Sequence, residues 1–290
     1  MEIRVGTASW SDPELVKSGW YPKEARRDSE ARLRYYASQF DTVEVDSSYY
    51  ALPKKENVAR WAERVPEGFI FHVKAYSAFT GHGLEAKALP RELRAWTDAQ
   101  GRIPQAAVPA GLIEAAWEIF QDALSPLREA GKLGYLLFQL PPWIHATQRA
   151  RSYLAELRRR TPGQMVAVEF RHPSWYADWP STHELLAEQD FIHVAVDGPP
   201  LPEVPPRILE ATGPMAVLRC HGRNTLSWRG LHQSAAQRFD WSYSEEEIAD
   251  LGSAAQELAR QEPTYVIFNN NHGDQAQRNA AQILALLGSS

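Results

Sequence analysis

The segment Val166–Trp175 places a carboxylate, a guanidinium and an imidazole close together at the end of a predicted strand. Successive side chains of a β-strand point to opposite faces, so the large apolar residues of this segment share one face. Glu169 and Arg171 lie on the other face, and His172 follows just before a proline that ends the strand. An ordinary half-exposed strand gives the same alternation. The segment therefore indicates a polar site only if other strands repeat the pattern.

Other segments do repeat a strand-like pattern, and helical spacing returns between most of them. They span residues 3–10, 42–50, 69–74, 136–139, 191–197, 216–221 and 265–268. Strands and helices that alternate about eight times over a chain of 290 residues favour a parallel sheet closed into a barrel. We therefore predict an α/β protein with a single (β/α)8 TIM-type barrel over residues 1–290. An open doubly wound sheet is the alternative, but the first strand continues as GTASWS and lacks the GxGxxG fingerprint.

Residues 75–112, which follow the third predicted strand, contain glycines and prolines but no long periodic run. Such a segment is long for a connection inside a compact domain, and long connections of this kind are often functional. We interpret it as an insertion that makes the barrel irregular. A lid over the barrel is one role that this insertion could have.

The composition is that of an ordinary globular protein, with 44% hydrophobic and 23% charged residues. The net charge of −5 lacks the basic balance of a general nucleic-acid binder, so such a partner stays open but is not favoured. Cys220 is the single cysteine, which suits a reducing compartment. No apolar run is long enough for a membrane span, and the N-terminus has no apolar signal segment. We expect a cytoplasmic protein without a membrane partner, whose oligomeric state the sequence leaves open.

One face of each barrel strand packs on the surrounding helices and the other points into the lumen. If the apolar face always packs on the helices, the polar face turns inward, mostly near the C-terminal end of each strand. TIM-barrel enzymes build their sites at that end. The rule predicts an inward set of Arg4, Glu44, Asp46, His72, Lys74, Gln139, Glu169, Arg171, His193, Asp197, Arg219 and His221.

The acids and bases of this inward set balance in number, and buried charges are expensive unless they are paired. A structural network of salt bridges that fills the lumen is therefore a serious alternative to a functional site. Arg4 comes early in its strand, near the barrel floor, and we assign it to structure. Apolar layers would fill a barrel at lower free energy, which favours a functional reason for the rest.

The inward set suits acid–base chemistry on an anion. A carboxylate beside a lysine or arginine stays charged and can act as a general base, and a histidine that titrates near neutrality can act as the partner acid. Lys74, Arg171 and Arg219 can hold a phosphate or carboxylate, the arginines through a bidentate fork. The predicted catalytic residues are Glu44, Glu169, His172 and His221.

Aromatic residues are frequent in the loops that follow the predicted strands. Gathered at one end of a polar barrel, they would suit stacking on a sugar or a base. Each of them alone is more often a packing residue. The predicted ligand-binding residues are Lys74, Gln139, Arg171, Asp197, Arg219, Asn269, Asn270, Trp10, Tyr49 and Trp175.

Other chemistries have weaker signals in this sequence. There is no HExxH, HxH or cysteine pair for a metal and no GxSxG elbow for a nucleophilic serine. Positive side chains in the same lumen would oppose a cation. We therefore expect no cofactor and assign no metal ligand. A divalent metal held by Glu44, Asp46, His72, Glu169, Asp197 and His221 is the alternative.

Six motifs along the chain match one known family in the right order. They are Val43–Tyr50, Val73–Ala75, Phe138–Pro142, Val168–Trp175, Arg219–Gly222 and Phe268–Asn271. With these motifs the chain resembles the YecE-like proteins, also called domain of unknown function 72, over practically its whole length. The resemblance implies a TIM-type barrel but no particular reaction. A kinship in shape with metal-dependent endonuclease barrels has been suggested for the family, which is an analogy of fold alone.

Three functions follow from these patterns as hypotheses. The first is an enzyme, a hydrolase or a lyase or isomerase, that uses acid–base chemistry on a small anionic ligand such as a sugar phosphate or a nucleotide. The second is a metal-dependent phosphodiesterase that acts on nucleic acid. The third is a non-catalytic ligand-binding or interaction protein whose charged lumen is a structural ion-pair core.

Overall fold

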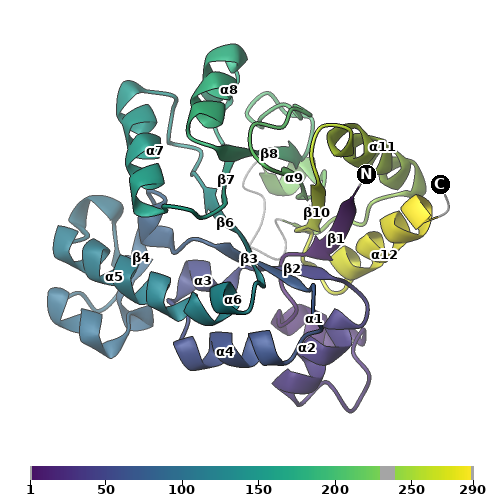
Figure 1. Ribbon diagram of the computed structural model, residues 1–290, viewed down its shortest axis with the longest axis horizontal. Helices are drawn as coiled ribbons and strands as arrows, with labels where there is room; N and C mark the ends of the chain where they lie inside the picture. The colour runs from purple at the N-terminus through teal and green to yellow at the C-terminus, as the bar shows by residue number, and fades with distance from the viewer. Residues whose placement is uncertain (1, 229–238, 289–290) are drawn as a thin grey trace.

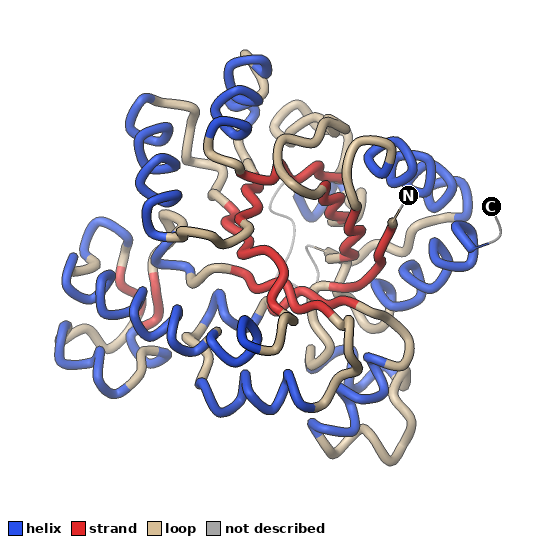
Figure 2. Tube along the Cα trace, in the orientation of Figure 1, coloured by secondary structure: helices blue, strands red, loops and turns tan. Residues whose placement is uncertain are grey.

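The computed structural model describes residues 2–228 and 239–288, and a barrel of parallel strands forms its centre (Figures 1 and 2). Neighbouring strands follow the order β1-β10-β9-β8-β7-β6-β3-β2, and β2 pairs with β1 to close the barrel. The strands span Ile3–Thr7 (β1), Thr42–Val45 (β2), Ile70–Lys74 (β3), Leu133–Gln139 (β6), Val166–Glu169 (β7), Phe191–Asp197 (β8), Ala216–Cys220 (β9) and Thr264–Phe268 (β10). The predicted (β/α)8 barrel is therefore confirmed, and the open sheet is excluded.

Helices surround the barrel (Figure 2), because their apolar faces cover the outward side chains of the strands. They span Pro13–Ser18 (α1), Ser29–Ala37 (α2), Ser47–Tyr50 (α3), Lys55–Glu63 (α4), Ala110–Ala123 (α5), Ser125–Glu129 (α6), Gln148–Arg160 (α7), Trp179–Glu188 (α8), Thr225–Trp228 (α9), Glu245–Ala259 (α11) and Gln275–Gly288 (α12). On α5, for example, Leu112, Ala116 and Phe120 recur at helical spacing and are all fully buried.

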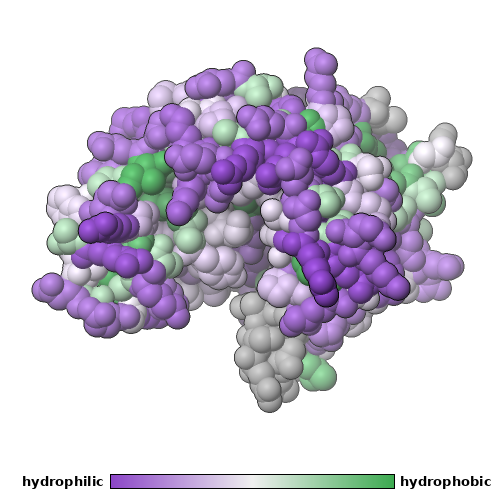
Figure 3. All heavy atoms as spheres, turned by 90° about the horizontal axis from the view of Figure 1, so that it is seen from below, coloured by the Kyte–Doolittle hydropathy of each residue, from purple (hydrophilic) through white to green (hydrophobic). Residues whose placement is uncertain are grey.

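Polar residues dominate the outside of the molecule. Figure 3 shows hydrophilic residues over most of one face, with hydrophobic residues only in small patches. Among the residues that the structure describes, no helix combines the length and the apolar character needed to cross a bilayer.

The chain between β3 and α5 forms short 3-10 helices and a two-stranded sheet where a barrel usually has only a short loop. The elements are Ser77–Phe79 (η1), Leu84–Glu85 (β4), Ala86–Ala88 (η2), Arg91–Trp96 (η3), Arg102–Ile103 (β5) and Gln105–Ala107 (η4). The Phe79 ring stacks on Trp117 of α5 with 4.1 Å between centroids. The Tyr153 hydroxyl on α7 donates to the Phe79 carbonyl. These contacts attach the start of the insertion to the helices outside the barrel.

The side chains inside the barrel form two layers. An apolar layer lies toward the N-terminal strand ends and includes Tyr135, Leu137, Ala167, Ile192, Val194, Val217 and Tyr265. A polar layer lies toward the C-terminal ends, because Gln139 and Glu169 come two residues after Leu137 and Ala167 on the same faces of β6 and β7. Glu44, Lys74 and Arg219 belong to the same polar layer. Apolar side chains thus fill the lumen toward the N-terminal strand ends, and the buried charges lie toward the C-terminal strand ends.

Strand β8 is oriented opposite to the prediction. Its Val196 pairs with Arg219, which faces the lumen, so the apolar side of β8 points inward. His193 and Asp197 therefore face the surrounding helices, and their predicted place in the lumen is wrong. The prediction failed because it required apolar contacts on the helix side. His193 contacts the Glu210 carbonyl there, 3.2 Å from its Nδ1, and the ring of Trp179 at 4.6 Å.

Candidate active site

Arg219 lies between two glutamates that come from different parts of the barrel wall. Its Nη2 donates to Oε1 of Glu44 at 2.5 Å, and its Nη1 donates to Oε2 of Glu169. All three side chains are completely buried. Burial opposes the charge of Arg219, but Glu44 and Glu169 raise its pKa above the ordinary value. Arg219 thus binds both carboxylates through its terminal nitrogens beneath the surface and positions them.

Glu169 is held in its charged form by four donors. Its Oε1 accepts from Nε of Arg171 at 2.7 Å, from Nε2 of Gln139 at 2.7 Å and from Nε2 of His221 at 3.1 Å. Arg219 donates to the other oxygen. Burial by itself would raise the pKa of Glu169, but Arg219, His221 and Arg171 lower it well below the ordinary value. Glu169 is therefore a carboxylate near neutral pH.

The partners of His221 favour one tautomer. The amide nitrogen Nδ2 of Asn269 lies 2.8 Å from its Nδ1, which favours a proton on Nε2. Nε2 lies 3.1 Å from Oε1 of Glu169 and 3.4 Å from Nη2 of Arg171. Burial lowers the pKa of His221 to about 3 in spite of the nearby carboxylate. The expectation that His221 titrates near neutrality is therefore wrong, because the ring is sealed from water.

Glu44 differs from Glu169 in its surroundings. Besides Arg219, the hydroxyl of Tyr135 lies 3.5 Å from its second carboxylate oxygen. Burial raises the pKa of Glu44 above the ordinary value, although Arg219 and Lys74 act against the rise. The two glutamates that share Arg219 thus have pKa values pushed in opposite directions. This is the pattern that separates a proton carrier from a permanent charge.

The outer part of the polar layer carries the cations Lys74 and Arg171 together with the carboxylate of Asp46. Lys74 and Arg171 are 8% and 9% exposed, whereas Glu44, Glu169 and Arg219 are all at 0%. The Lys74 ammonium binds Oδ1 of Asp46 at 2.7 Å and lies 4.6 Å from the centre of the Tyr49 ring. The Arg171 guanidinium lies 5.4 Å from the ring of Trp228. A molecule that enters the barrel from its C-terminal end therefore meets these two cations before the glutamates.

Of the three aromatic residues predicted to bind a ligand, Trp10 and Trp175 are packing residues. Trp10 packs edge-on against Trp61 at 5.4 Å and against Phe71 at 6.0 Å. Trp175 is completely buried and stacks on Phe170 at 4.1 Å. Both indoles are covered by the protein itself and have no free face for a ligand. Tyr49 differs, since it lies half-buried against Lys74.

His172 and Asn270 also lie outside the cluster around Arg219. The His172 ring stacks on His145 at 3.7 Å, and its Nδ1 lies 2.8 Å from the Ser174 hydroxyl. Asn270 donates to the Trp241 carbonyl at 2.7 Å and to Asn279 of α12 at 2.9 Å. Their contacts order the loops after β7 and β10. Neither side chain shares a hydrogen bond with Glu44 or Glu169 among the described residues.

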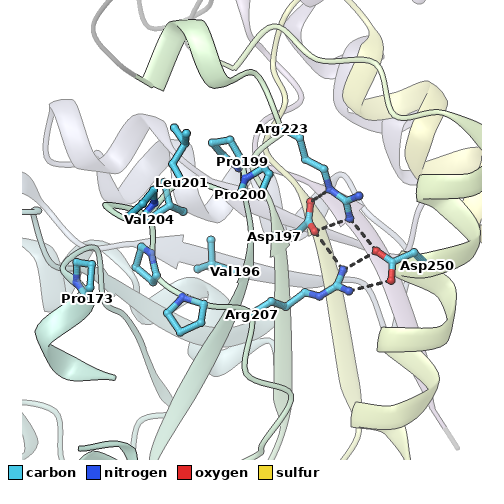
Figure 4. Close-up of a pocket in the computed structure, with 14 residues that line it drawn as sticks. Pro173, Val196, Asp197, Pro199, Pro200, Leu201, Val204, Arg207, Arg223 and Asp250 are labelled. Atoms are coloured by element: carbon cyan, nitrogen blue, oxygen red, sulfur yellow. Dashed lines mark hydrogen bonds and ion pairs between the residues drawn. The ribbon is translucent and has the colours of Figure 1, made fainter. Parts of the chain in front are cut away.

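Asp197 lies in a separate ion-pair cluster outside the lumen (Figure 4). Arg223 donates to its Oδ1 at 2.8 Å, Arg207 at 3.1 Å, and the Tyr243 hydroxyl binds Oδ2 at 2.8 Å. Both arginines also bind Asp250 of α11. The cluster forms one side of a proline-rich pocket of about 560 Å³. Asp197 thus joins β8 to α11 and does not belong with the predicted ligand-binding residues in the barrel.

A model of one protein family matches residues 4–290, practically the whole chain. The chain belongs to the DUF72 family of proteins of unknown function. The UPF0759 protein YunF of Bacillus subtilis is 30% identical over 98% of this chain and 94% of its own length. The UPF0759 protein YecE of Escherichia coli is 36% identical over 72 residues, which are 25% of this chain and 23% of YecE.

Solved DUF72 structures resemble this DUF72 protein along its entire length. One from Thermotoga maritima matches with a TM-score of 0.79 and 30% identity, over 99% of this chain and 100% of that one. One from Enterococcus faecalis matches with a TM-score of 0.77 and 29% identity, over 100% and 98%. A D-psicose 3-epimerase from Clostridium cellulolyticum is 8% identical with a TM-score of 0.51, over 99% and 98%. That likeness shows a shared barrel fold alone.

The six side chains of the alternative metal set do not form one group in the described part of the chain. Within residues 2–228 and 239–288, no three His, Cys, Asp or Glu side chains form a group that could hold an ion. Asp197 lies outside the lumen, and Glu44 and Glu169 are each bound to Arg219. Of the alternative metal set, Asp46 is bound to Lys74.

Sequence reasoning missed three residues that shape this region. Tyr135 was hidden by its position in an apolar run, although its alternation with Leu137 and Gln139 places it in the lumen. His82 lies in the insertion, whose path no periodicity revealed, and its ring is 5.3 Å from Tyr49. Trp143 is one of many aromatic residues in the loops, none of which the sequence singles out, and it lies 5.3 Å from His82.

Proposed function

We propose that this DUF72 protein is an enzyme that uses acid–base chemistry on a small anionic ligand bound at the C-terminal mouth of the barrel. The order of burial supports this proposal most directly. Lys74 and Arg171 keep a small exposed area, as Gln139 and Asp46 do, whereas Glu44 and Glu169 lie fully buried beneath them. An incoming anion therefore meets Arg171 and Lys74, the latter paired with Asp46, before it reaches either glutamate.

Lys74 and Arg171 differ in what they offer to the anion. Arg171 binds Glu169 through its Nε, and its Nη2 lies 3.4 Å from Nε2 of His221, so the guanidinium offers its Nη1 to an anion. Lys74 supplies a compact charge on a flexible stem, and it can rotate away from Asp46 toward a ligand. Together they suit a phosphate or a carboxylate.

Glu44 is the better candidate for the proton carrier. Its raised pKa brings it closer to neutral pH, where a group exchanges protons most effectively. Glu169 is fixed as a carboxylate by its four donors and serves to orient Arg171 and His221. Arg219 links the two glutamates, so that a change of charge on Glu44 is felt at Glu169.

The anion site can be tested by titrating the protein with inorganic phosphate in a calorimeter. Lys74→Ala and Arg171→Ala should each abolish the binding that the wild-type protein shows. Lys55→Ala is the matched control, because Lys55 forms a similar ion pair with Asp122, at 2.6 Å, on the outer helices. Equal binding in all four proteins would refute the anion site.

Catalysis requires a second test. A panel of sugar phosphates and nucleotides is incubated with wild-type protein and with Glu44→Gln, and turnover is followed by phosphorus NMR. We expect Glu44→Gln to bind phosphate like the wild type but to lose turnover. A wild-type protein that binds members of the panel and converts none would favour the non-catalytic ligand-binding function.

A further inference from the structure

Four rings form a continuous row at the mouth of the barrel. Tyr50 lies 5.0 Å from Tyr49, Tyr49 lies 5.3 Å from His82, and His82 lies 5.3 Å from Trp143, each pair edge to face. They come from three separate parts of the chain, namely α3, the insertion and the loop after β6. We call these four residues the aromatic row.

The ends of the aromatic row are exposed to an unusual degree. Tyr50 is 58% exposed and Trp143 is 56% exposed, although the protein buries most of its other large rings. A large ring left in water forgoes the free energy of burial, and exposed rings beside a polar site are a common feature of ligand-binding surfaces. The exposure of these two rings therefore favours a ligand that covers them when it binds.

Positive charge accompanies the aromatic row. The Lys74 ammonium lies over the ring of Tyr49 at 4.6 Å. Arg102, on β5 of the insertion, is exposed and lies on the strand beside β4, which begins two residues after His82. Burial, together with the positive charges of Lys74, Arg171 and Arg102, lowers the pKa of His82 to about 4. Three cations thus lie near enough to His82 to act on its charge.

The insertion holds its part of the row in place. A side chain at Gly81 would lie 3.4 Å from Ile144, so the backbone before His82 packs closely on the loop that carries Trp143. The Nδ1 of His82 lies 2.9 Å from the Thr80 hydroxyl. Phe79 is stacked on α5, as described above. The row is therefore a preformed wall of the mouth.

We propose that the ligand of this DUF72 protein is a phosphate ester that carries a flat aromatic ring, of the nucleoside monophosphate class. Its phosphate binds Lys74 and Arg171, Arg102 of the insertion adds a third positive charge, and its ring packs on the exposed face of Trp143. This inference rests on the proposed anion site and adds the aromatic row as the part that selects the ligand. Stacking of a base on a protein ring strengthens binding roughly 5- to 150-fold.

The test compares AMP, ribose 5-phosphate and inorganic phosphate by calorimetry. Wild-type protein should bind AMP at least about five-fold more tightly than ribose 5-phosphate. Trp143→Ala should remove that difference and leave the affinity for inorganic phosphate unchanged. Arg102→Ala should weaken all three ligands alike. Trp96→Ala is the matched control, because Trp96 is a 48% exposed indole of the same insertion that packs against Gly111 outside the row.

The outcomes separate this inference from the proposed function. Equal binding of AMP, ribose 5-phosphate and phosphate to the wild type would overturn the inference and leave the anion site standing. Binding of a short single-stranded oligonucleotide without any binding of AMP would overturn it in favour of a nucleic-acid partner. Failure of all the phosphate ligands to bind would overturn the inference and the anion site together.

Discussion

Arg219 on β9 and Glu44 on β2 meet inside the barrel with 2.5 Å between Nη2 and Oε1, although 175 residues separate them in the chain. The contact exists because the barrel closes between β2 and β1 and brings the ends of the sheet together. Both side chains are fully buried, so each depends on the other for its charge. This pair connects the stability of the barrel with the chemistry proposed for it.

Removing Arg219 should be strongly destabilising. Arg219→Met leaves Glu44 and Glu169 facing each other in the lumen without their shared cation. Breaking a buried ion pair from one side typically costs about 3–5 kcal/mol, and we expect a loss of that size in the free energy of unfolding. Urea denaturation measures it, with Arg160→Ala as a control on a partly exposed pair with Glu114. A loss below about 1 kcal/mol would show that the buried pair contributes little.

The two glutamates should respond unequally to neutralisation. In Glu169→Gln, an uncharged amide replaces a carboxylate that accepts from four donors. In Glu44→Gln, the amide replaces a carboxyl whose raised pKa already favours the neutral form. We therefore expect Glu169→Gln to reduce the free energy of unfolding by about 3 kcal/mol or more, and Glu44→Gln by clearly less. Urea denaturation of both variants at pH 7 decides the point. Equal losses would contradict the difference in pKa between the two carboxyls.

The stability of the protein should fall as the pH falls below about 6.5. Burial lowers the pKa of His193 to about 4 and that of His221 to about 3, so the folded state binds fewer protons than the unfolded state in this range. Each such histidine removes up to about 1.4 kcal/mol per pH unit between about 6.5 and its folded pKa. His193→Gln should flatten this dependence in urea denaturation at pH 7, 6 and 5. Parallel curves for the variant and the wild type would mean that His193 is protonated in the fold.

The tautomer of His221 can be observed directly. Nitrogen NMR should show a neutral ring with its proton on Nε2 from pH 7 down to pH 5, because Asn269 donates to Nδ1. Asn269→Ala should release this constraint and change the chemical shifts of both ring nitrogens. Signals of a doubly protonated ring at pH 6 would contradict the sealed environment.

Trp175 and Trp143 should contribute very differently to the free energy of unfolding. Trp175→Ala removes a fully buried ring that stacks on Phe170, and a loss of about 3–5 kcal/mol in the free energy of unfolding is expected. Trp143→Ala removes a ring that is 56% exposed and should change the free energy by no more than about 0.5 kcal/mol. Thermal and urea unfolding give both values. Similar losses would show that Trp143 also supports the fold.

The eight strands and much of the polar layer could be predicted from residue types alone. Alternation on β7 placed Glu169 on the face opposite its large apolar residues, and the same rule placed Glu44, Lys74, Gln139 and Arg219 correctly. The reason is that a two-residue period is a local property of an extended chain. The family resemblance pointed to the same barrel.

The rule failed on β8, because alternation reveals two faces but does not say which one is the inside. Asp197 can face the helices only because Arg207, Arg223 and Tyr243 reach it from other parts of the chain. No local pattern records such partners. Which side chains share a face, and near which strand end they lie, can thus be predicted from the sequence.

The contacts between these side chains, and their exposure to water, follow from the tertiary structure alone. In the folded protein Arg219 is buried between two glutamates. Lys74 and Arg171 lie at the mouth, and His82 of the insertion lies against Tyr49. Burial and long-range contacts set the pKa values of Glu44, Glu169 and His221, and these depend on distances between residues far apart in the chain. Periodicity is local, but closure of a barrel is a property of the whole chain.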